Sequence, residues 1–219
     1  MINNKFFITG WNHSGTTIVQ HTISKQLGII TEERLEESLP NLNDSSKFVW
    51  KYPGEMRQKT YKYLKNLLSN PKQPLHVVFV IRDSNDLISS VIKREIKFKK
   101  NEEEIVSDLF SQYTFFLKFI TEEFIKNYNN YSVVKLEDFA CNPESFLEKL
   151  NLNNYEVEKK NVNISERPKD IDHKKLRIWQ SKQSIDKNII QHSDIKYKES
   201  DEIEKYHEIL LHEYTKKDL

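Results

Sequence analysis

The sequence contains only one cysteine, only four glycines and no long apolar run in its 219 residues. A single cysteine, Cys141, cannot form an intrachain disulfide, and the N-terminus lacks a basic, apolar, small-residue leader. The apolar runs are far shorter than the roughly 20 residues that span a bilayer. We therefore expect a cytoplasmic protein without a membrane span, in which Cys141 fills a small space in the core.

An excess of charge of one sign is also lacking. The chain has 34 basic and 33 acidic residues, a net charge of +1, so it has no overall attraction to nucleic acid or an anionic membrane. Charged residues make up 31% of the chain, but the apolar residues are grouped in periodic segments, which favours a globular protein over a disordered one. We interpret residues 1–219 as a single domain, and any anion site in it as local.

The apolar segments alternate between two patterns. Short apolar runs predict strands at 6–9, 48–50, 76–81 and 131–136. Apolar residues at helical spacing predict helices over 18–27, 61–68, 87–96, 104–128 and 203–214, and another helix starts where Asn142 and Pro143 provide an N-cap and a first-turn proline. This alternation predicts an α/β fold. We expect a three-layer sandwich with a central, mostly parallel sheet of four or five strands and a helical C-terminal region.

Two of the four glycines flank a polar loop between the first strand and the first helix. In "FFITGWNHSGTTIVQ", Gly10 and Gly15 are separated by four residues and followed by two threonines. This is the outline of a nucleotide-binding P-loop, but that motif has lysine where this chain has Thr16. The backbone amides of residues 13–17 can still surround an anion at the positive end of the helix. A phosphate-containing donor without a metal-bridged γ-phosphate fits this loop better than ATP.

A second polar segment follows the buried strand at 76–81. In "FVIRDSNDLISS", Arg82 comes at the strand end, where a guanidinium can hold a phosphate bidentately, and Ser90 follows eight residues later. With the loop "HSGTT", this spacing resembles the sulfotransferase family, and Asp83 and Asp86 match the family's "RDPxD" pattern with Ser84 in place of the proline. The segment "VVKLEDFACNPESFLEKL" is also similar to the family's "YEDL…DPE…L". The resemblance covers roughly residues 5–150.

The resemblance implies a P-loop kinase-like fold and transfer of a sulfuryl group from 3′-phosphoadenosine 5′-phosphosulfate (PAPS) to a hydroxyl or amine, without a required metal. Arg82 and Ser90 would bind the 3′-phosphate of PAPS. The family acts on sugars, proteins, lipids and small phenols, and we favour a carbohydrate among these small-molecule or glycan acceptors. The 5′-phosphosulfate would be bound by the loop residues His13, Ser14, Gly15, Thr16 and Thr17.

The chain departs from the family pattern at the catalytic positions. His13 stands where the family has Lys or Arg, and it can neutralise the leaving phosphate oxygen only when it is protonated; we expect bound anions to raise its pKa, and the rate to vary across the His titration range. Lys51 is the second cation, near the transferring group. Its replacement by alanine should lower turnover and leave binding of the product PAP largely intact.

The general base is the least defined part of the site. The histidine that some family members use corresponds to Pro53, so we look to the acidic segment "GIITEERLEESL". Glu33 is the first choice and Glu36 the second, with Glu55 as an alternative outside this segment. Clustered glutamates are usually a solvated face, which is the competing interpretation.

The basic segment "ERPKDIDHKKLRIW" would close over the 3′-phosphate and adenine, with Arg177 as the main candidate and Arg167 and Lys175 as others. The scattered histidines predict no metal site. Two alternatives to a sulfotransferase remain open. One is a P-loop-type small-molecule kinase, which the missing lysine at Thr16 disfavours. The other is a non-catalytic nucleotide-binding module with the same fold.

Overall fold

The computed structural model describes residues 5–28, 47–53, 57–71, 74–96, 101–152 and 192–216. These residues form an α/β structure around one sheet. Its strands pair in the order β2-β1-β3-β4, and every pairing is parallel. The prediction of an α/β fold with a central parallel sheet is therefore confirmed for the described residues. The strands are β1 (Lys5–Gly10), β2 (Phe48–Pro53), β3 (His76–Ile81) and β4 (Tyr131–Lys135).

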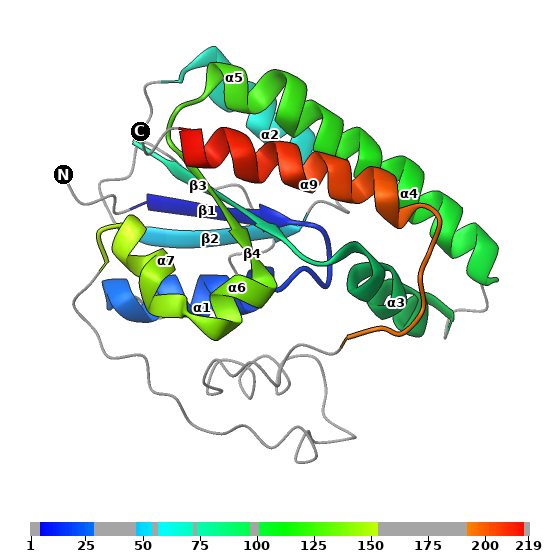
Figure 1. Cartoon of the computed structure of the whole chain (residues 1–219). Coiled ribbons are helices and arrows are strands. Elements are labelled where there is room, and N and C mark those ends of the chain that lie inside the picture. The colour runs from blue at the N-terminus through cyan, green and yellow to red at the C-terminus, as the bar shows by residue number, and fades with distance from the viewer. Residues whose placement is uncertain are drawn as a thin grey trace.

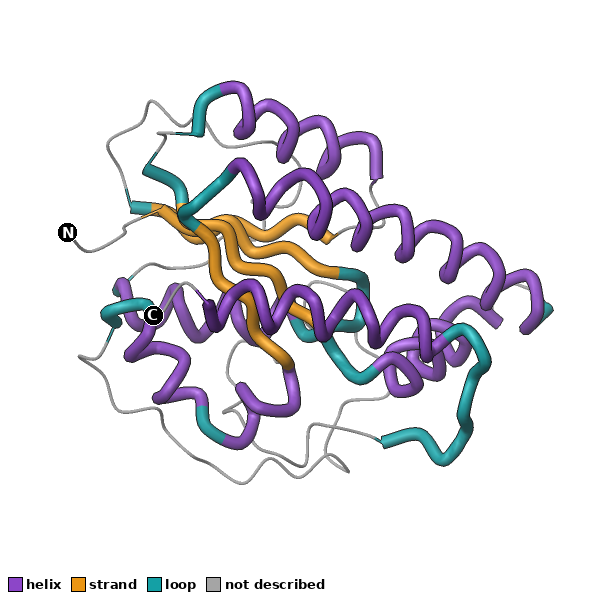
Figure 2. The backbone as a smooth tube through the Cα atoms, turned by 45° about the horizontal axis from the view of Figure 1, so that its top comes forward, coloured by secondary structure: helices purple, strands orange, loops and turns teal. Residues whose placement is uncertain are grey.

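Helices cover both faces of the sheet (Figures 1 and 2). In Figure 1, α2, α4, α5 and α9 lie over one face, and α1, α6 and α7 lie over the other. The helical segments are α1 (Thr16–Leu27), α2 (Arg57–Ser69), α3 (Ser84–Glu95), α4 (Glu102–Phe119), the π-helical η3 (Ile120–Phe124), α5 (Ile125–Asn127), α6 (Leu136–Cys141), α7 (Pro143–Lys149) and α9 (Ser200–Thr215).

The apolar strands form two cores, one on each face. All six residues of β3 are buried. Val77 and Phe79 belong to the cluster that also contains apolar residues of α2, α3, α4 and α9, whereas Val78 and Val80 belong to the cluster under α1, α6 and α7. Because successive side chains of a strand point to opposite faces, a strand covered on both faces needs a continuous apolar run. This is why β3 is the clearest strand in the sequence.

The strand order contains a reversal next to β1. The connection through α1 carries the chain from β1 to β2 at one edge, and the next strand, β3, pairs with the opposite side of β1. The segments that follow β1 and β3 therefore leave the sheet in different directions at its carboxyl edge. In open parallel sheets this switch point is where ligands bind. The loop at 11–15 and the segment starting at Arg82 both begin at this point.

Two local expectations were wrong, and a third was confirmed with one irregularity. The helix predicted over 104–128 is present, but a π-helical turn separates α4 from α5. Leu136 begins the short helix α6 instead of ending a strand. Six residues are too few for a helical period to show against a strand signal, so the sequence did not indicate α6. Cys141, at the end of α6, is exposed instead of filling the core.

None of the helices in the described ranges combines the length and the apolar character needed to cross a membrane.

Candidate functional site

Gly10, the last residue of β1, allows the loop that follows to turn tightly against the sheet. A Cβ atom on Gly10 would lie 2.3 Å from the carbonyl oxygen of Val80 and 2.7 Å from Ser14 Oγ. Contacts this short do not occur with real Cβ atoms, so a side chain at Gly10 would displace either β3 or the loop. The glycine therefore lets the loop fold back over the end of β3.

The loop itself contains two residues in the left-handed backbone region. His13 has φ of +69° and Gly15 has φ of +93°. Glycine adopts this region easily, whereas a histidine there carries a modest conformational cost. Gly15 is also closely packed, because a Cβ atom on it would lie 2.4 Å from Leu136 Cδ1 at the start of α6. The second glycine of the motif is therefore required both by its conformation and by its neighbour.

The loop delivers the N-terminus of α1 to the carboxyl edge of the sheet. Among the described residues, no side chain caps this end of the helix. Because Thr16 and Thr17 lie in the first turn, their amides have no intrahelical acceptor, and they add to the positive end of the helix dipole. Ser14 is fully buried beside them, and its Oγ has no hydrogen-bond partner among the described residues. These groups are donors that an anion would satisfy.

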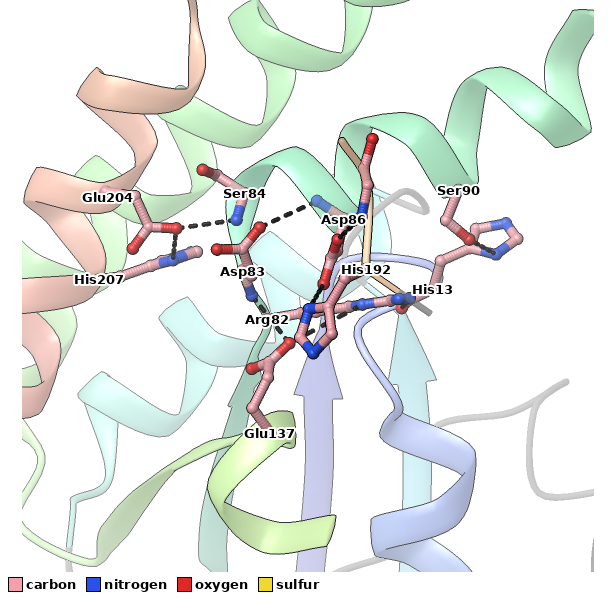
Figure 3. A network of polar contacts seen from close by, with 11 residues as sticks. His13, Arg82, Asp83, Ser84, Asp86, Ser90, Glu137, His192, Glu204 and His207 are labelled. Atoms are coloured by element: carbon pink, nitrogen blue, oxygen red, sulfur yellow. Dashed lines mark hydrogen bonds and ion pairs between the residues drawn. The ribbon is translucent and has the colours of Figure 1, made fainter. Parts of the chain in front are cut away.

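Arg82 links the end of β3 to this loop (Figure 3). Its Nη1 donates a hydrogen bond to the carbonyl oxygen of His13 at 3.1 Å, and its side chain is only 10% exposed. Its Nε lies 4.0 Å from Glu137 Oε1, at the beginning of α6. The guanidinium is thus held between the loop after β1 and the segment after β4. It brings a fixed positive charge to the switch point.

The ring of His13 lies between two residues of α3. Its Nδ1 is 3.1 Å from Ser90 Oγ, and its Nε2 is 3.4 Å from Nη1 of Arg94. Burial, together with the positive charges of Arg94 and Arg82, lowers the pKa of His13 from its usual 6.5 to about 4. In this arrangement the ring is neutral at neutral pH, so the arginines and not His13 carry the positive charge beside the loop.

Lys51 approaches the same helix from β2. Its Nζ donates to Thr17 Oγ1 at 2.8 Å, and the residue is only 7% exposed. Trp50 and Tyr52 pack into the core on the other face, so the alternation of the strand points Lys51 toward α1. A lysine after the second glycine is absent from this loop, yet an ammonium group still reaches the first turn of the helix.

Glu137 is a buried acid at the same edge. Its Oε1 accepts from the amide of Asp83 at 3.1 Å, while its Oε2 has no hydrogen-bond partner among the described residues. Burial raises the pKa of Glu137, and hydrogen bonds from its own amide and that of Asp83, with the charges of Lys135 and Arg82, oppose that rise. Glu137 therefore holds the backbone at the start of α3 and faces Arg82.

The start of α3 is held in place by carboxylates (Figure 3). Asp83 is its N-cap and accepts from the amide of Asp86 at 3.0 Å. Glu204 on α9 accepts from the amide of Ser84 at 2.8 Å. Asp86 in turn binds His192 Nδ1 at 2.9 Å and the amide of residue 193. The two aspartates of the "RDSND" segment thus position α3, which carries Ser90 and Arg94.

The structure brings the main predicted donor-site residues to one place. They come from the loop after β1, the start of α1, the end of β2 and the segment after β3. The predicted residues found there are His13, Ser14, Gly15, Thr16, Thr17, Lys51, Arg82 and Ser90. The other predicted residues lie outside the described ranges, and their roles stay predictions: Glu33, Glu36, Glu55, Arg167, Lys175 and Arg177.

Sequence reasoning missed two charged residues of this edge. Arg94 lies four residues after Ser90, a spacing that places two side chains on the same face of a helix, and this spacing was a usable signal. Glu137 follows the fourth strand, where the switch-point rule directs attention. No comparable signal connected Asp86 with His192, because their contact joins positions 106 residues apart.

Within residues 5–28, 47–53, 57–71, 74–96, 101–152 and 192–216, no group of three His, Cys, Asp or Glu residues is arranged to hold a metal ion. The comparisons with known proteins add no assignment. No protein-family model matches the chain, and no curated protein matches it significantly.

Proposed function

We propose that this protein is a sulfotransferase that uses PAPS as its donor. One observation carries the proposal: Arg82 at the end of β3 binds the loop at the N-terminus of α1, beside Ser90 of α3, at the switch point of a parallel sheet. This places a helix N-terminus, a guanidinium and a hydroxyl together. It is the combination that the resemblance to sulfotransferases predicts.

The cations form two groups, which suits a donor with two anionic ends. Lys51 contacts Thr17 at the first turn of α1, while Arg82 and Arg94 lie on the other side of the loop, around His13. The Lys51 group would bind the 5′-phosphosulfate. The Arg82 and Ser90 group would bind the 3′-phosphate, which ATP does not have. The buried Ser14 Oγ, with no partner among the described residues, fits a loop that accepts an anion.

Sulfuryl transfer requires the protein mainly to position the reactants and to stabilise the developing charge. The acceptor oxygen or nitrogen bonds to sulfur, the bond between sulfur and the 5′-phosphate oxygen breaks, PAP leaves, and the acceptor's proton passes to a base. Lys51 and the amides of Thr16 and Thr17 would stabilise the negative charge that grows on the leaving oxygen. Such preorganised donors are typically worth about 100- to 1,000-fold in rate each.

Calorimetric titration with PAP, and separately with ATP and magnesium, tests the donor. We expect the wild-type protein to bind PAP more tightly than magnesium ATP. Arg82→Ala should weaken PAP binding by about 10- to 100-fold, because hydrogen bonds to charged groups contribute about 1.5–3 kcal/mol. Arg82→Lys keeps the charge but loses the planar fork, and it should bind PAP with intermediate affinity.

Preference for magnesium ATP over PAP would contradict the proposal and favour a small-molecule kinase. Tight PAP binding without transfer of label from radioactive PAPS to any acceptor in a panel of glycans and phenols would favour the non-catalytic module. Label transfer that Lys51→Ala reduces without weakening PAP binding would support the full proposal.

A further inference from the structure

We propose that Arg94 supplies the positive charge that this loop lacks at His13, and that His13 acts as a neutral positioning residue that holds Ser90 and Arg94 toward the bound anion. This inference rests on the proposed function in one respect, namely the identity of the anion as the 3′-phosphate of the donor.

The hydrogen-bond chemistry of the three side chains fixes their roles. A guanidinium can only donate, so His13 Nε2, 3.4 Å from Nη1 of Arg94, must accept. A neutral imidazole with an accepting Nε2 carries its hydrogen on Nδ1, and this nitrogen lies 3.1 Å from Ser90 Oγ. Ser90 therefore accepts from His13, and its own hydroxyl hydrogen is left to point at another acceptor. The ring thus leaves the hydroxyl hydrogen of Ser90 available for donation to another acceptor, such as a bound anion.

The charges around His13 agree with this assignment. The charged groups that face the ring are Arg94 on α3 and Arg82 at the end of β3, and both lower the pKa of His13 in addition to the effect of burial. A second positive charge on the ring would be repelled by both guanidinium groups. Because arginine stays charged at all physiological pH values, this site keeps its positive charge where a histidine would lose it.

The position of Arg94 allows it to contact both His13 and an anion. It follows Ser90 by four residues, so both side chains lie on one face of α3. Its side chain is 46% exposed, and its Nε lies 3.9 Å from Glu95 Oε1, a weak surface ion pair. The neighbouring Lys93 is also exposed, and the two hydrogen bonds of the His13 ring go to Ser90 and Arg94 instead. Lys93 therefore serves as a matched control with the same charge on the same helix.

Titration with PAP of the wild-type protein and three variants tests the role of the charge. We expect Arg94→Gln to weaken PAP binding by about 5- to 20-fold, in the range of a partly exposed charged contact. Arg94→Lys should recover part of this loss because it restores the charge. Lys93→Gln should change PAP affinity by less than about twofold, since distant exposed charges are screened.

Nuclear magnetic resonance of His13 supplies a second readout that needs no donor. Long-range nitrogen–proton spectra should show the tautomer with hydrogen on Nδ1, and Arg94→Gln should raise the pKa of His13 whereas Lys93→Gln should not. Observation of the Nε2–H tautomer would overturn the proposal, as would equal PAP affinities of Arg94→Gln and Lys93→Gln; in both cases the proposed function stands if wild-type protein binds PAP. A wild-type protein that binds no PAP would overturn the proposed function and this inference with it.

Discussion

The two ends of the sheet differ in how completely their polar groups are paired by hydrogen bonds. At the amino end, His76 Nδ1 lies 2.7 Å from Asn130 Oδ1 and His76 Nε2 lies 2.7 Å from Ser132 Oγ. Tyr128 OH donates to the carbonyl oxygen of Leu75 at 2.5 Å. Both ring nitrogens of His76 are thus paired with neutral neighbours. The described polar groups around His76 thus form a paired network that stabilises the fold.

The carboxyl end contains donors that have no acceptor among the described residues, close to Arg82, Arg94 and Lys51. The amides of Thr16 and Thr17 have no intrahelical acceptor, Ser14 Oγ has none among the described residues, and the ring of His13 faces two arginines. The role of a histidine can therefore be inferred only together with its neighbours. His76 is bonded to neutral groups, whereas His13 lies beside two arginines. The donors without acceptors among the described residues support the proposed anion site at the carboxyl end.

The largest difference is expected between the glycines at the two ends of α1. Gly15 and Gly28 both have positive φ, but a Cβ atom on Gly15 would overlap Leu136, whereas one on Gly28 would meet no atom of the described residues within 4 Å. Gly28→Ala should lower the free energy of unfolding by about 1–2 kcal/mol from backbone strain alone. Gly15→Ala should lower it by about 2–5 kcal/mol, because overpacking adds about 1–3 kcal/mol. Urea denaturation measures both, and equal losses would contradict the packing of Gly15 against α6.

The next largest difference is expected between two buried serines. Ser132→Ala removes the partner of His76 and should cost about 1–3 kcal/mol in unfolding free energy without changing PAP affinity. Ser14→Ala removes a hydroxyl without a partner among the described residues, so it should leave stability nearly unchanged and weaken PAP binding. Denaturation and calorimetry on both variants provide the comparison. A Ser14→Ala variant that loses stability but not affinity would show that this end is structural too.

The pH dependence of stability should report the environment of His13. The pKa of His13 is about 4 in the folded protein and near 6.5 when unfolded, so the unfolded state binds more protons between these values. Stability should therefore fall as the pH falls from about 6.5 to 4. His13→Asn tolerates the left-handed backbone and should flatten this part of the profile. An unchanged slope in the variant would contradict the environment assigned to His13.

The smallest effect is expected for Glu204, which accepts a hydrogen bond from the amide of Ser84 at the start of α3. Burial alone would raise the pKa of Glu204, but the His207 imidazole and the hydrogen bond from Ser84 outweigh it and hold the pKa at about 2. The stabilisation is present above the usual pKa of 4.5 and is lost as the pH falls toward 2. Glu204→Gln should lower the unfolding free energy by about 1 kcal/mol at pH 7, and by less at pH 3. Urea denaturation at both pH values measures this, and an equal loss at both would contradict a role for the charge.

Much of this arrangement could be predicted from the sequence. The sequence predicts β3 because it is a nearly continuous apolar run, which is typical of a strand in a sheet that is covered on both faces. The sequence also predicts that Arg82 lies near the loop after β1, because parallel strands bring their carboxyl ends to one edge of the sheet. Each of these predictions used a local pattern and one rule of topology.

The rest depended on contacts that no local pattern encodes. The lowered pKa of His13 depends on burial and on Arg94 and Arg82, which are distant in sequence. The expectation of a protonated His13 concerned the complex with bound anions and stays a prediction. The pairing of Asp86 with His192 and of Glu204 with Ser84 joins positions more than 100 residues apart. Helix α6 was missed because a six-residue helix is too short to show its period.

The most direct test of the central claim is to map PAP onto the sheet by amide chemical shifts. The account predicts that PAP shifts the signals of Gly15, Thr16, Thr17 and Ser90 at the carboxyl end and leaves those of Asn130 and Ser132 at the amino end unchanged. Shifts confined to the amino end, or no shifts at saturating PAP, would contradict the assignment of the carboxyl end as the donor site.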